Sequence, residues 1–144
     1  MSTVSKLLSI KGHEVLTISP KDTAFDAIKI MVEKGAGSLL VVDKAGKLAG
    51  IVSERDCVRK VVLKEKDAKQ ITVREIMSKE LTVVNPDTSV EECMAIMTEK
   101  RVRHLPVMEK GKIVGIVSIG DAVKFMVSEK DFIIKNLEQY IAGG

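Results

Sequence analysis

The chain contains one short motif twice, and this duplication is the strongest constraint on its fold. The segment GIVSERD at residues 50–56 returns as GIVSIGD at residues 115–121, so glycine, serine and aspartate keep their spacing. Each copy follows an apolar run of strand length and precedes a helical pattern of apolar residues. The fold must therefore present the same strand-to-helix corner in two places.

Ser53 and Asp56 in the first copy, and Ser118 and Asp121 in the second, are expected at helix N-termini. Free backbone N–H groups and the positive end of the helix dipole favour anionic groups there. A serine and an aspartate three residues apart can also cap the helix by binding its own backbone donors. Both interpretations stay open for one copy, whereas the fixed spacing in two copies favours ligand contact over capping alone.

Other segments match between the copies in the same order. Residues 3–8 match residues 72–77, and the second of these segments predicts a capping box for a short helix. Residues 16–20 match residues 82–86 as short extended runs that end at proline. Proline lacks the N–H that a strand ladder needs, so each run is expected to stop there.

Each copy continues with an amphipathic helix, a hairpin and a closing helix. The strands at residues 38–43 and 104–109 are each followed by a tight turn, at Gly46 or Gly111, and by a second strand. Each repeat is therefore predicted as β-α-β-β-α. The predicted core faces of the four helices are Ala24, Ala27, Ile28, Met31 and Val32; Val90, Cys93, Met94 and Met97; Val58, Val61 and Val62; and Ala122, Val123, Phe125 and Met126.

These matches predict a first repeat with its N-terminal segment at residues 1–66, a second repeat at residues 67–128 and a helical extension at residues 129–144. Within the extension, residues 131–141 predict a third amphipathic helix without a counterpart in the first repeat. Its apolar stripe is expected to pack on the same domain or on a dimer mate, and comprises Phe132, Ile133, Leu137, Tyr140 and Ile141.

Composition narrows the classes of function. The 144 residues carry a net charge of +3, with 30% charged residues of both signs, which favours neither a nucleic-acid nor a membrane-surface partner. Aromatic residues make up 3%, too few for base-stacking platforms. Apolar runs are far shorter than a bilayer span and the N-terminus has no signal-peptide pattern, so a cytoplasmic location is expected. Cys57 and Cys93 show no metal-binding spacing and are expected to be small apolar core residues.

Neither repeat alone has enough surface to close a good core, so the two are expected to pack sheet to sheet about a pseudo-two-fold axis. This α+β arrangement would leave two clefts, each with apolar walls and one Ser/Asp helix N-terminus at its rim. An apolar slot fits a nucleobase, an aspartate can accept hydrogen bonds from both ribose hydroxyls, and amides with basic side chains suit phosphate. The clefts are therefore expected to suit a nucleotide.

The doubled pattern resembles the tandem cystathionine-β-synthase (CBS) domain, also called the Bateman module. The resemblance covers residues 3 to about 127 and rests on VLTISPKDTAFDAIKIM, SLLVVDKAGKLAGIVSERD, TVVNPDTSVEECMAIM and RHLPVMEKGKIVGIVSIGD. The stretch VRHLPV and the closing NLEQYIAGG look like stand-alone CBS-pair proteins. The resemblance implies a non-catalytic regulatory module, such as an energy sensor, that binds AMP, ADP, ATP, NAD or S-adenosylmethionine. It implies no required cofactor, and it implies a homodimer that acts on a regulated protein partner.

The resemblance also implies roles for single residues. Asp56 and Asp121 match the aspartates that bind the ribose hydroxyls, and the neighbouring serines match hydroxyl residues near ribose and phosphate. The turn before the second strand matches positions where family members place basic residues on phosphates; it comprises Ala36, Gly37, Val102 and Arg103. The remaining matched ligand positions, most of which line the base slot, are Leu16, Ile51, Leu81, Thr82, Pro106 and Ile116.

The two copies differ in this turn, since Gly37-Ser38 stands where the second copy has Arg103-His104. Arg103 carries a permanent charge and a bidentate fork, so it suits a phosphate better than His104 does. For His104, a phosphate contact and a structural hydrogen bond at the strand edge stay equally open. The sequence therefore predicts unequal sites, with the second copy dominant.

Two other classes of function compete with a sensor. An enzyme would need a nucleophile beside a base, or a metal cluster, and the sequence offers neither; His13 and His104 are its only histidines. A protein scaffold with vestigial clefts is disfavoured by the intact Ser/Asp pairs in both copies. The sequence leaves open which adenosyl ligand binds and which protein responds.

Overall fold

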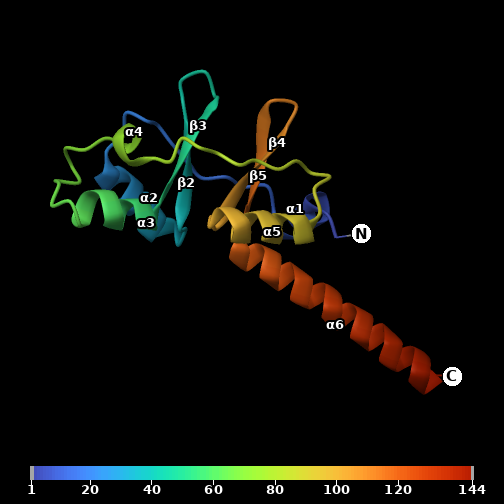
Figure 1. Ribbon diagram of the computed structural model, residues 1–144. Helices are drawn as coiled ribbons and strands as arrows, with labels where there is room; N and C mark the ends of the chain where they lie inside the picture. Colours follow the sequence, from blue (N-terminus) through green and yellow to red (C-terminus); the bar gives the residue numbers. More distant parts are fainter. Residues whose placement is uncertain (1, 144) are drawn as a thin grey trace. The chain divides into compact units, whose positions relative to one another are not determined.

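The computed structural model describes residues 2–143, with the side chains of residues 140, 142 and 143 excepted. The chain forms two compact units, each a mixed α+β structure with its own core (Figure 1). We call Glu14–Thr82 the first-repeat unit. Met1–His13 and Val83–Gly144 together form the second-repeat unit.

The first-repeat unit contains a mixed three-stranded sheet, with one parallel and one antiparallel strand pair. Its elements are β1 (Thr17–Ile18), α2 (Ala24–Lys34), β2 (Ser38–Val42), β3 (Leu48–Ser53), α3 (Glu54–Cys57), the π-helix η1 (Val58–Val62) and α4 (Val73–Ile76). The strand order is β1-β2-β3, with β1 parallel to β2 and β2 antiparallel to β3. The hairpin register places Ser38 opposite Ser53, so the last residue of β3 lies beside the first residue of β2.

The second-repeat unit is built from a hairpin and three helices. Its elements are α1 (Val4–Lys11), α5 (Val90–Lys100), β4 (His104–Glu109), β5 (Lys112–Ser118) and α6 (Ile119–Gly143). Strands β4 and β5 pair antiparallel, with His104 opposite Ser118. This register repeats that of the first hairpin, so the two strand-to-helix corners are matched as the sequence predicts.

The second-repeat unit lacks a regular counterpart of β1. Val84 makes only an isolated parallel bridge to Val107. In the first-repeat unit, Leu40 N donates to Leu16 O over 3.0 Å. The matching position in β4 is Pro106, which has no N–H to donate. The predicted β-α-β-β-α order is therefore complete in the first repeat, whereas the second has a single bridge in place of its first strand.

Each unit includes the short leading helix of the other repeat. Helix α1 precedes the first repeat in sequence, but its Val4 N donates to Thr88 O over 2.8 Å in the second-repeat unit. Helix α4 precedes the second repeat, and its Val73 N donates to Asp22 O over 2.7 Å in the first-repeat unit. The segment that leads the first repeat in sequence thus belongs to the second-repeat unit, and the segment that leads the second repeat belongs to the first-repeat unit. We call this arrangement the exchange of leading segments.

Two glycines permit the leading segments to lie directly on the hairpins. A Cβ atom at Gly50 would lie 2.7 Å from Met77 Sδ and 2.8 Å from Ser78 O. A Cβ atom at Gly115 would lie 2.8 Å from Leu8 Cδ1. These distances are well inside van der Waals contact, so the repeated glycine of the motif is explained by close packing.

The predicted core faces are confirmed at most of their positions. The buried residues among them are Ala24, Ala27, Met31, Val61, Val90, Cys93, Met97, Ala122 and Phe125. The prediction is wrong at Val32 and Val123, which are exposed, and at two valines of the first closing helix, Val58 and Val62. In η1, Leu63 N donates to Val58 O, five residues back, so the helix is wider than an α-helix and only one of its three predicted valines reaches the core.

The predicted third helix is not a separate element. Helix α6 runs without a break from Ile119 to Gly143, because the polar residues 128–131 include no glycine or proline that would end it. Its predicted apolar stripe is exposed, while the side chain of Tyr140 lies outside the described residues. Among residues 2–143, no helix combines the length and apolarity needed to cross a bilayer. The sheet-to-sheet packing of the two repeats stays a prediction.

Candidate functional site

At the start of α3, Ser53 and Asp56 form a complete capping box. Asp56 N donates to Ser53 Oγ over 3.2 Å, and Ser53 N donates to Asp56 Oδ2 over 2.9 Å. The Ser53 hydroxyl donates to the same carboxylate oxygen over 3.1 Å. Both side chains are half-buried, so the carboxylate is fixed by the backbone and still reaches the surface.

The start of α6 has the same arrangement. Asp121 N donates to Ser118 Oγ over 3.0 Å, and Ser118 N donates to Asp121 Oδ2 over 2.9 Å. The capping interpretation therefore holds in both copies. Each cap uses Oδ2 of the aspartate, and a ribose hydroxyl could still donate to Oδ1, so capping does not exclude ligand contact.

The helix N-termini offer fewer free donors than the motif suggests. The first helical N–H of α3, that of Glu54, donates to Gly37 O over 3.1 Å. The corresponding N–H of α6, that of Ile119, donates to Arg103 O over 2.8 Å. Since the aspartate N–H donates to the serine, one of the first three helical N–H groups in each copy is left for an anion. An anionic ligand would therefore depend on basic side chains.

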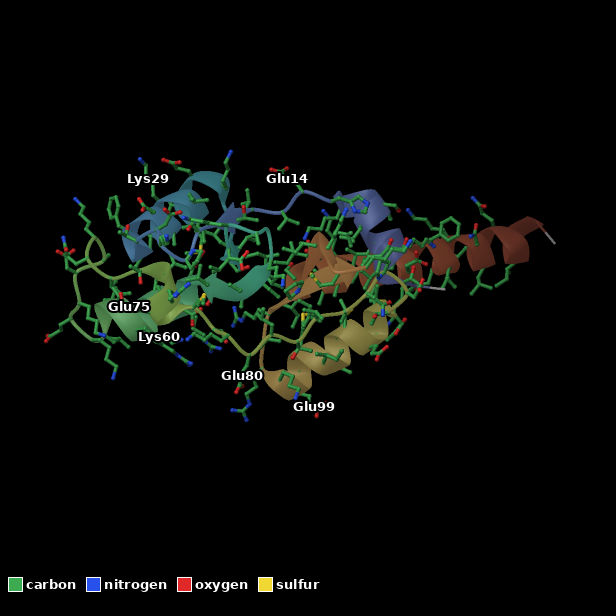
Figure 2. All side chains as sticks on the ribbon, turned by 90° about the horizontal axis from the view of Figure 1, so that it is seen from above. Glu14, Lys29, Lys60, Glu75, Glu80 and Glu99 are labelled. Atoms are coloured by element: carbon green, nitrogen blue, oxygen red, sulfur yellow. The ribbon has the colours of Figure 1, made fainter. Side chains whose placement is uncertain are left out.

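A lysine lies beside each aspartate, and the sequence prediction included neither. Lys60 Nζ lies 3.3 Å from Asp56 Oδ1 and donates to Ile76 O over 2.9 Å. Figure 2 shows Lys60 and Glu75 in the green part of the chain, on η1 and α4. Lys60 is four residues after Asp56, a spacing that predicts a pair on one helix face, so this contact could have been found from sequence.

In the second-repeat unit the lysine comes from a distant segment. Lys11 Nζ, at the end of α1, donates to Asp121 Oδ2 over 2.5 Å and to Ile116 O over 2.6 Å. Because 110 residues separate Lys11 from Asp121 in the chain, no local pattern predicts this pair. The exchange of leading helices places it there.

Two pKa shifts report the local electrostatics of the second corner. Burial raises the pKa of Asp121, but the hydrogen bonds from Lys11 and Ser118 outweigh burial, so the pKa lies below the ordinary 3.8. Burial, followed by the charge of Lys11, lowers the pKa of His104 below 6.5 despite the opposing effect of Asp121. His104 is therefore neutral at pH 7, and the cations at this corner are Lys11 and Arg103.

The predicted ligand residues divide between the two units. In the first-repeat unit lie Leu16, Ala36, Gly37, Ile51, Ser53, Asp56, Leu81 and Thr82. In the second-repeat unit lie Val102, Arg103, His104, Pro106, Ile116, Ser118 and Asp121. Leu81 and Thr82 come from the second copy of the sequence yet belong to the first-repeat unit. Their roles, like those of the other predicted ligand residues, stay predictions.

The hairpin residues that precede each corner have different backbone partners. Ile51 N donates to Ser78 O over 3.1 Å, and Ser78 N donates to Ile51 O over 2.8 Å. At the matching Ile116, the carbonyl accepts from the ammonium of Lys11 instead. The isoleucine before the first corner is thus paired to backbone, whereas the one before the second corner is bonded to a charged side chain.

The two cysteines lie in the two cores. Cys57 and Cys93 are buried free thiols, and burial raises the pKa of each to about 11, so both fit the predicted core role. The part of the chain described by the structure contains no group of three metal-ligating side chains. A shallow hollow of about 340 Å³ lies apart from the predicted ligand residues, and is lined by Ser19, Pro20, Lys21, Asp43, Lys44, Ala45 and Arg74.

Two mixed α+β repeats, each with a capped carboxylate at the same strand-to-helix corner, define a duplicated module with two matched polar corners. The chain belongs to the CBS domain family, which matches residues 8–63 and 73–128. CBS-domain pairs commonly serve as regulatory modules that bind adenosine ligands, and they are generally non-catalytic.

The chain is similar to proteins from bacteria and plants. A putative signal-transduction protein with CBS domains from Burkholderia ambifaria MC40-6 is 48% identical, with a TM-score of 0.84 over 88% of this chain and 95% of that one. The CBS domain-containing protein CBSX3, mitochondrial, of Arabidopsis thaliana is 38% identical over 99% of this chain and 73% of its own length. A hexameric CBS-CP12 protein from bloom-forming cyanobacteria is 33% identical, with a TM-score of 0.77 over 85% of this chain and 70% of that one.

Proposed function

We propose that the protein is a non-catalytic sensor that binds an adenosine-containing nucleotide at the Ser/Asp corners and alters the response of a protein partner. The observation that carries this proposal is the repeated geometry of Ser53 with Asp56 and of Ser118 with Asp121. In both copies the carboxylate is held by the backbone and is only half-buried. A fixed carboxylate that keeps one oxygen outside its cap suits a ribose diol.

The charges at the second corner favour a phosphate-bearing ligand. Lys11 donates to Asp121, and the backbone of Arg103 lies at the same corner, where its carbonyl accepts from Ile119 N. Two cations suit the phosphates of AMP, ADP, ATP or NAD better than the sulfonium cation of S-adenosylmethionine. The first corner has Gly37 and Ser38 at the positions that match Arg103 and His104, so we expect it to bind more weakly.

The test is calorimetric titration of the full chain with AMP, ADP, ATP, NAD and S-adenosylmethionine. Asp121→Asn keeps an oxygen for the cap but removes the charge, so we expect it to weaken nucleotide binding about 10- to 100-fold, and more than Asp56→Asn. The matched control is Asp87→Asn, an exposed aspartate of the second-repeat unit, which should bind like the wild type.

Three outcomes would contradict parts of the proposal. No heat with any of these ligands would contradict nucleotide sensing and favour the scaffold alternative. Equal losses in Asp56→Asn and Asp121→Asn would contradict the inequality of the corners. Turnover of a bound nucleotide, lost in Asp121→Asn, would contradict a non-catalytic role. A cytoplasmic location and a homodimeric assembly stay predictions of the sequence.

A further inference from the structure

The C-terminal part of α6 extends beyond the core of its own unit. An ion pair joins α6 to α1 at Glu129, whose Oε1 lies 2.9 Å from Lys6 Nζ. Residues 130–139 are exposed throughout. In Figure 1 this part of α6 extends away from α1, α5 and the hairpin of the same unit. An exposed helix usually presents mainly polar residues, but here exposed apolar residues are interleaved with the polar ones.

One face of α6 carries an exposed apolar row at coiled-coil spacing. The row, which we call the α6 seam, comprises Val123, Val127, Lys130, Ile134, Leu137 and Ile141. Its steps alternate between four and three residues, the a/d pattern of a two-helix interface. Its five apolar members are all exposed, and Leu137 is 56% exposed. A seam of this kind fits another helix with the same period.

The single lysine in the seam favours one orientation of that second helix. In a parallel pair of identical helices, Lys130 would face Lys130 of the second copy, and two like charges would be brought together. In an antiparallel pair centred between Lys130 and Ile134, each seam residue faces a different residue of the second copy. Lys130 then faces Ile134, Val127 faces Leu137 and Val123 faces Ile141. The lysine stem can then pack on isoleucine while its ammonium remains in water.

The charges along the edges of the seam point the same way. One edge carries Lys124, Asp131 and Glu138 at seven-residue intervals, while the other carries Met126 and Ile133. In an antiparallel pair, equivalent edges meet, so Lys124 lies near Glu138 of the second copy at both ends of the pair and the two apolar edges also meet. Asp131 faces Asp131 of the second copy once, at the centre, so the two opposite-charge pairs outnumber the single like-charge pair. In a parallel pair each charged edge would face an apolar edge, and no opposite charges would pair.

We propose that α6 binds α6 of a second copy of this chain as an antiparallel helix pair through the α6 seam. The proposal concerns the assembly of the protein and does not require a bound nucleotide. A failure of this proposal would therefore leave the proposed sensing function untouched, and a failure of the sensing function would leave this proposal untouched.

The first test is sedimentation equilibrium of the full chain without nucleotide. We expect a dimer for the wild type. Leu137→Glu should raise the dissociation constant at least about tenfold, because the symmetric pair contains this layer twice. The matched control is Phe132→Glu: Phe132 is 66% exposed on the opposite face of the same helix, so this change should leave the dissociation constant within about threefold. A monomeric wild type, or a dimer that Leu137→Glu does not weaken, would overturn the proposal.

The second test addresses orientation by exchange of charge. Lys124→Glu should weaken the dimer, and the double variant Lys124→Glu with Glu138→Lys should restore it, because the antiparallel pair brings these residues together. Fourteen residues span about 21 Å along a helix, so a parallel pair could not show this rescue. Weakening without rescue would overturn the antiparallel arrangement. Unchanged circular dichroism and thermal unfolding at low protein concentration would confirm that the variants are folded.

Discussion

The two aspartates of the repeated motif have nearly identical caps but different cations. Asp56 lies near a lysine four residues later on the same segment, whereas Asp121 is bound by Lys11, 110 residues earlier in the chain. The caps follow directly from Ser and Asp at a strand-to-helix corner, and so could be predicted. The Lys11 contact depends on the exchange of α1, which no residue near Asp121 indicates.

Removal of Lys11 tests the balance of forces on Asp121. In Lys11→Met the largest remaining influence is burial, which raises the pKa, so we expect the pKa of Asp121 to rise from its depressed value. A depressed carboxyl pKa stabilises the fold above about pH 4 and loses this effect as the pH falls through the folded value. The variant should therefore begin acid unfolding at a higher pH than the wild type.

The measurement is an NMR titration of the Asp121 carboxyl, with acid unfolding followed in parallel. Lys6→Met is the matched control, because Lys6 lies on the same helix α1 but pairs with Glu129 instead. It should leave the pKa of Asp121 unchanged. A fall in that pKa in Lys11→Met would show that the ammonium does not control this carboxyl.

At the scale of elements, the leading segments and the hairpins meet at two glycines with different neighbours. Gly50→Ala would place a Cβ against both a methionine side chain and the backbone oxygen of Ser78, which is itself paired to β3. Gly115→Ala would meet the side chain of Leu8, nearest at its two methyl groups, and this side chain can adjust. Backbone cannot move without loss of its hydrogen bonds, so the first clash is the more costly.

We expect Gly50→Ala to lower the free energy of unfolding by about 1–3 kcal/mol, and Gly115→Ala by less. Urea unfolding of both variants measures the difference. Gly120→Ala is the control, since its Cβ would lie 3.7 Å from Ser118 Oγ, an ordinary van der Waals contact. Equal losses at Gly50 and Gly115 would contradict the distinction between backbone and side-chain neighbours.

Most elements could be predicted from periodicity and turn residues, and the failures have physical causes. The hairpins follow from alternating apolar strands around Gly46 and Gly111, both of which have positive φ. The exposure of Val58 and Val62 follows from the π-helical hydrogen bonds of η1, which the spacing of apolar residues does not reveal. The continuity of α6 was missed because a polar stretch within a helix resembles a linker.

At the scale of the whole molecule, one unit is formed by a continuous segment of the chain and the other by two separate segments. The first-repeat unit is one continuous segment, Glu14–Thr82, whereas the second-repeat unit needs Met1–His13 in addition to Val83–Gly144. The core of the second-repeat unit includes Leu7 and Leu8 of α1, both almost fully buried. Without α1, this core would lose side chains that each contribute about 2–5 kcal/mol.

We therefore expect a fragment of residues 14–82 to keep its fold, and a fragment of residues 83–144 to lose the packed hairpin. Addition of a peptide of residues 1–13 should restore it. Dispersion of the amide NMR signals of β4 and β5 measures this, since helix α6 alone would contribute to circular dichroism. A fragment of residues 83–144 that shows the same dispersion without the peptide would contradict the structural need for α1.

The exchange of α1 also bears on biosynthesis. The first-repeat unit is complete once Thr82 has left the ribosome, whereas α1, translated before that unit, gains its first partners when residues 86–90 emerge and its full core only with β5 and the start of α6. Until then Leu7 and Leu8, which are buried in the folded protein, lack the core that covers them. A tag fused ahead of Ser2 would thus affect the maturation of the second repeat more than that of the first.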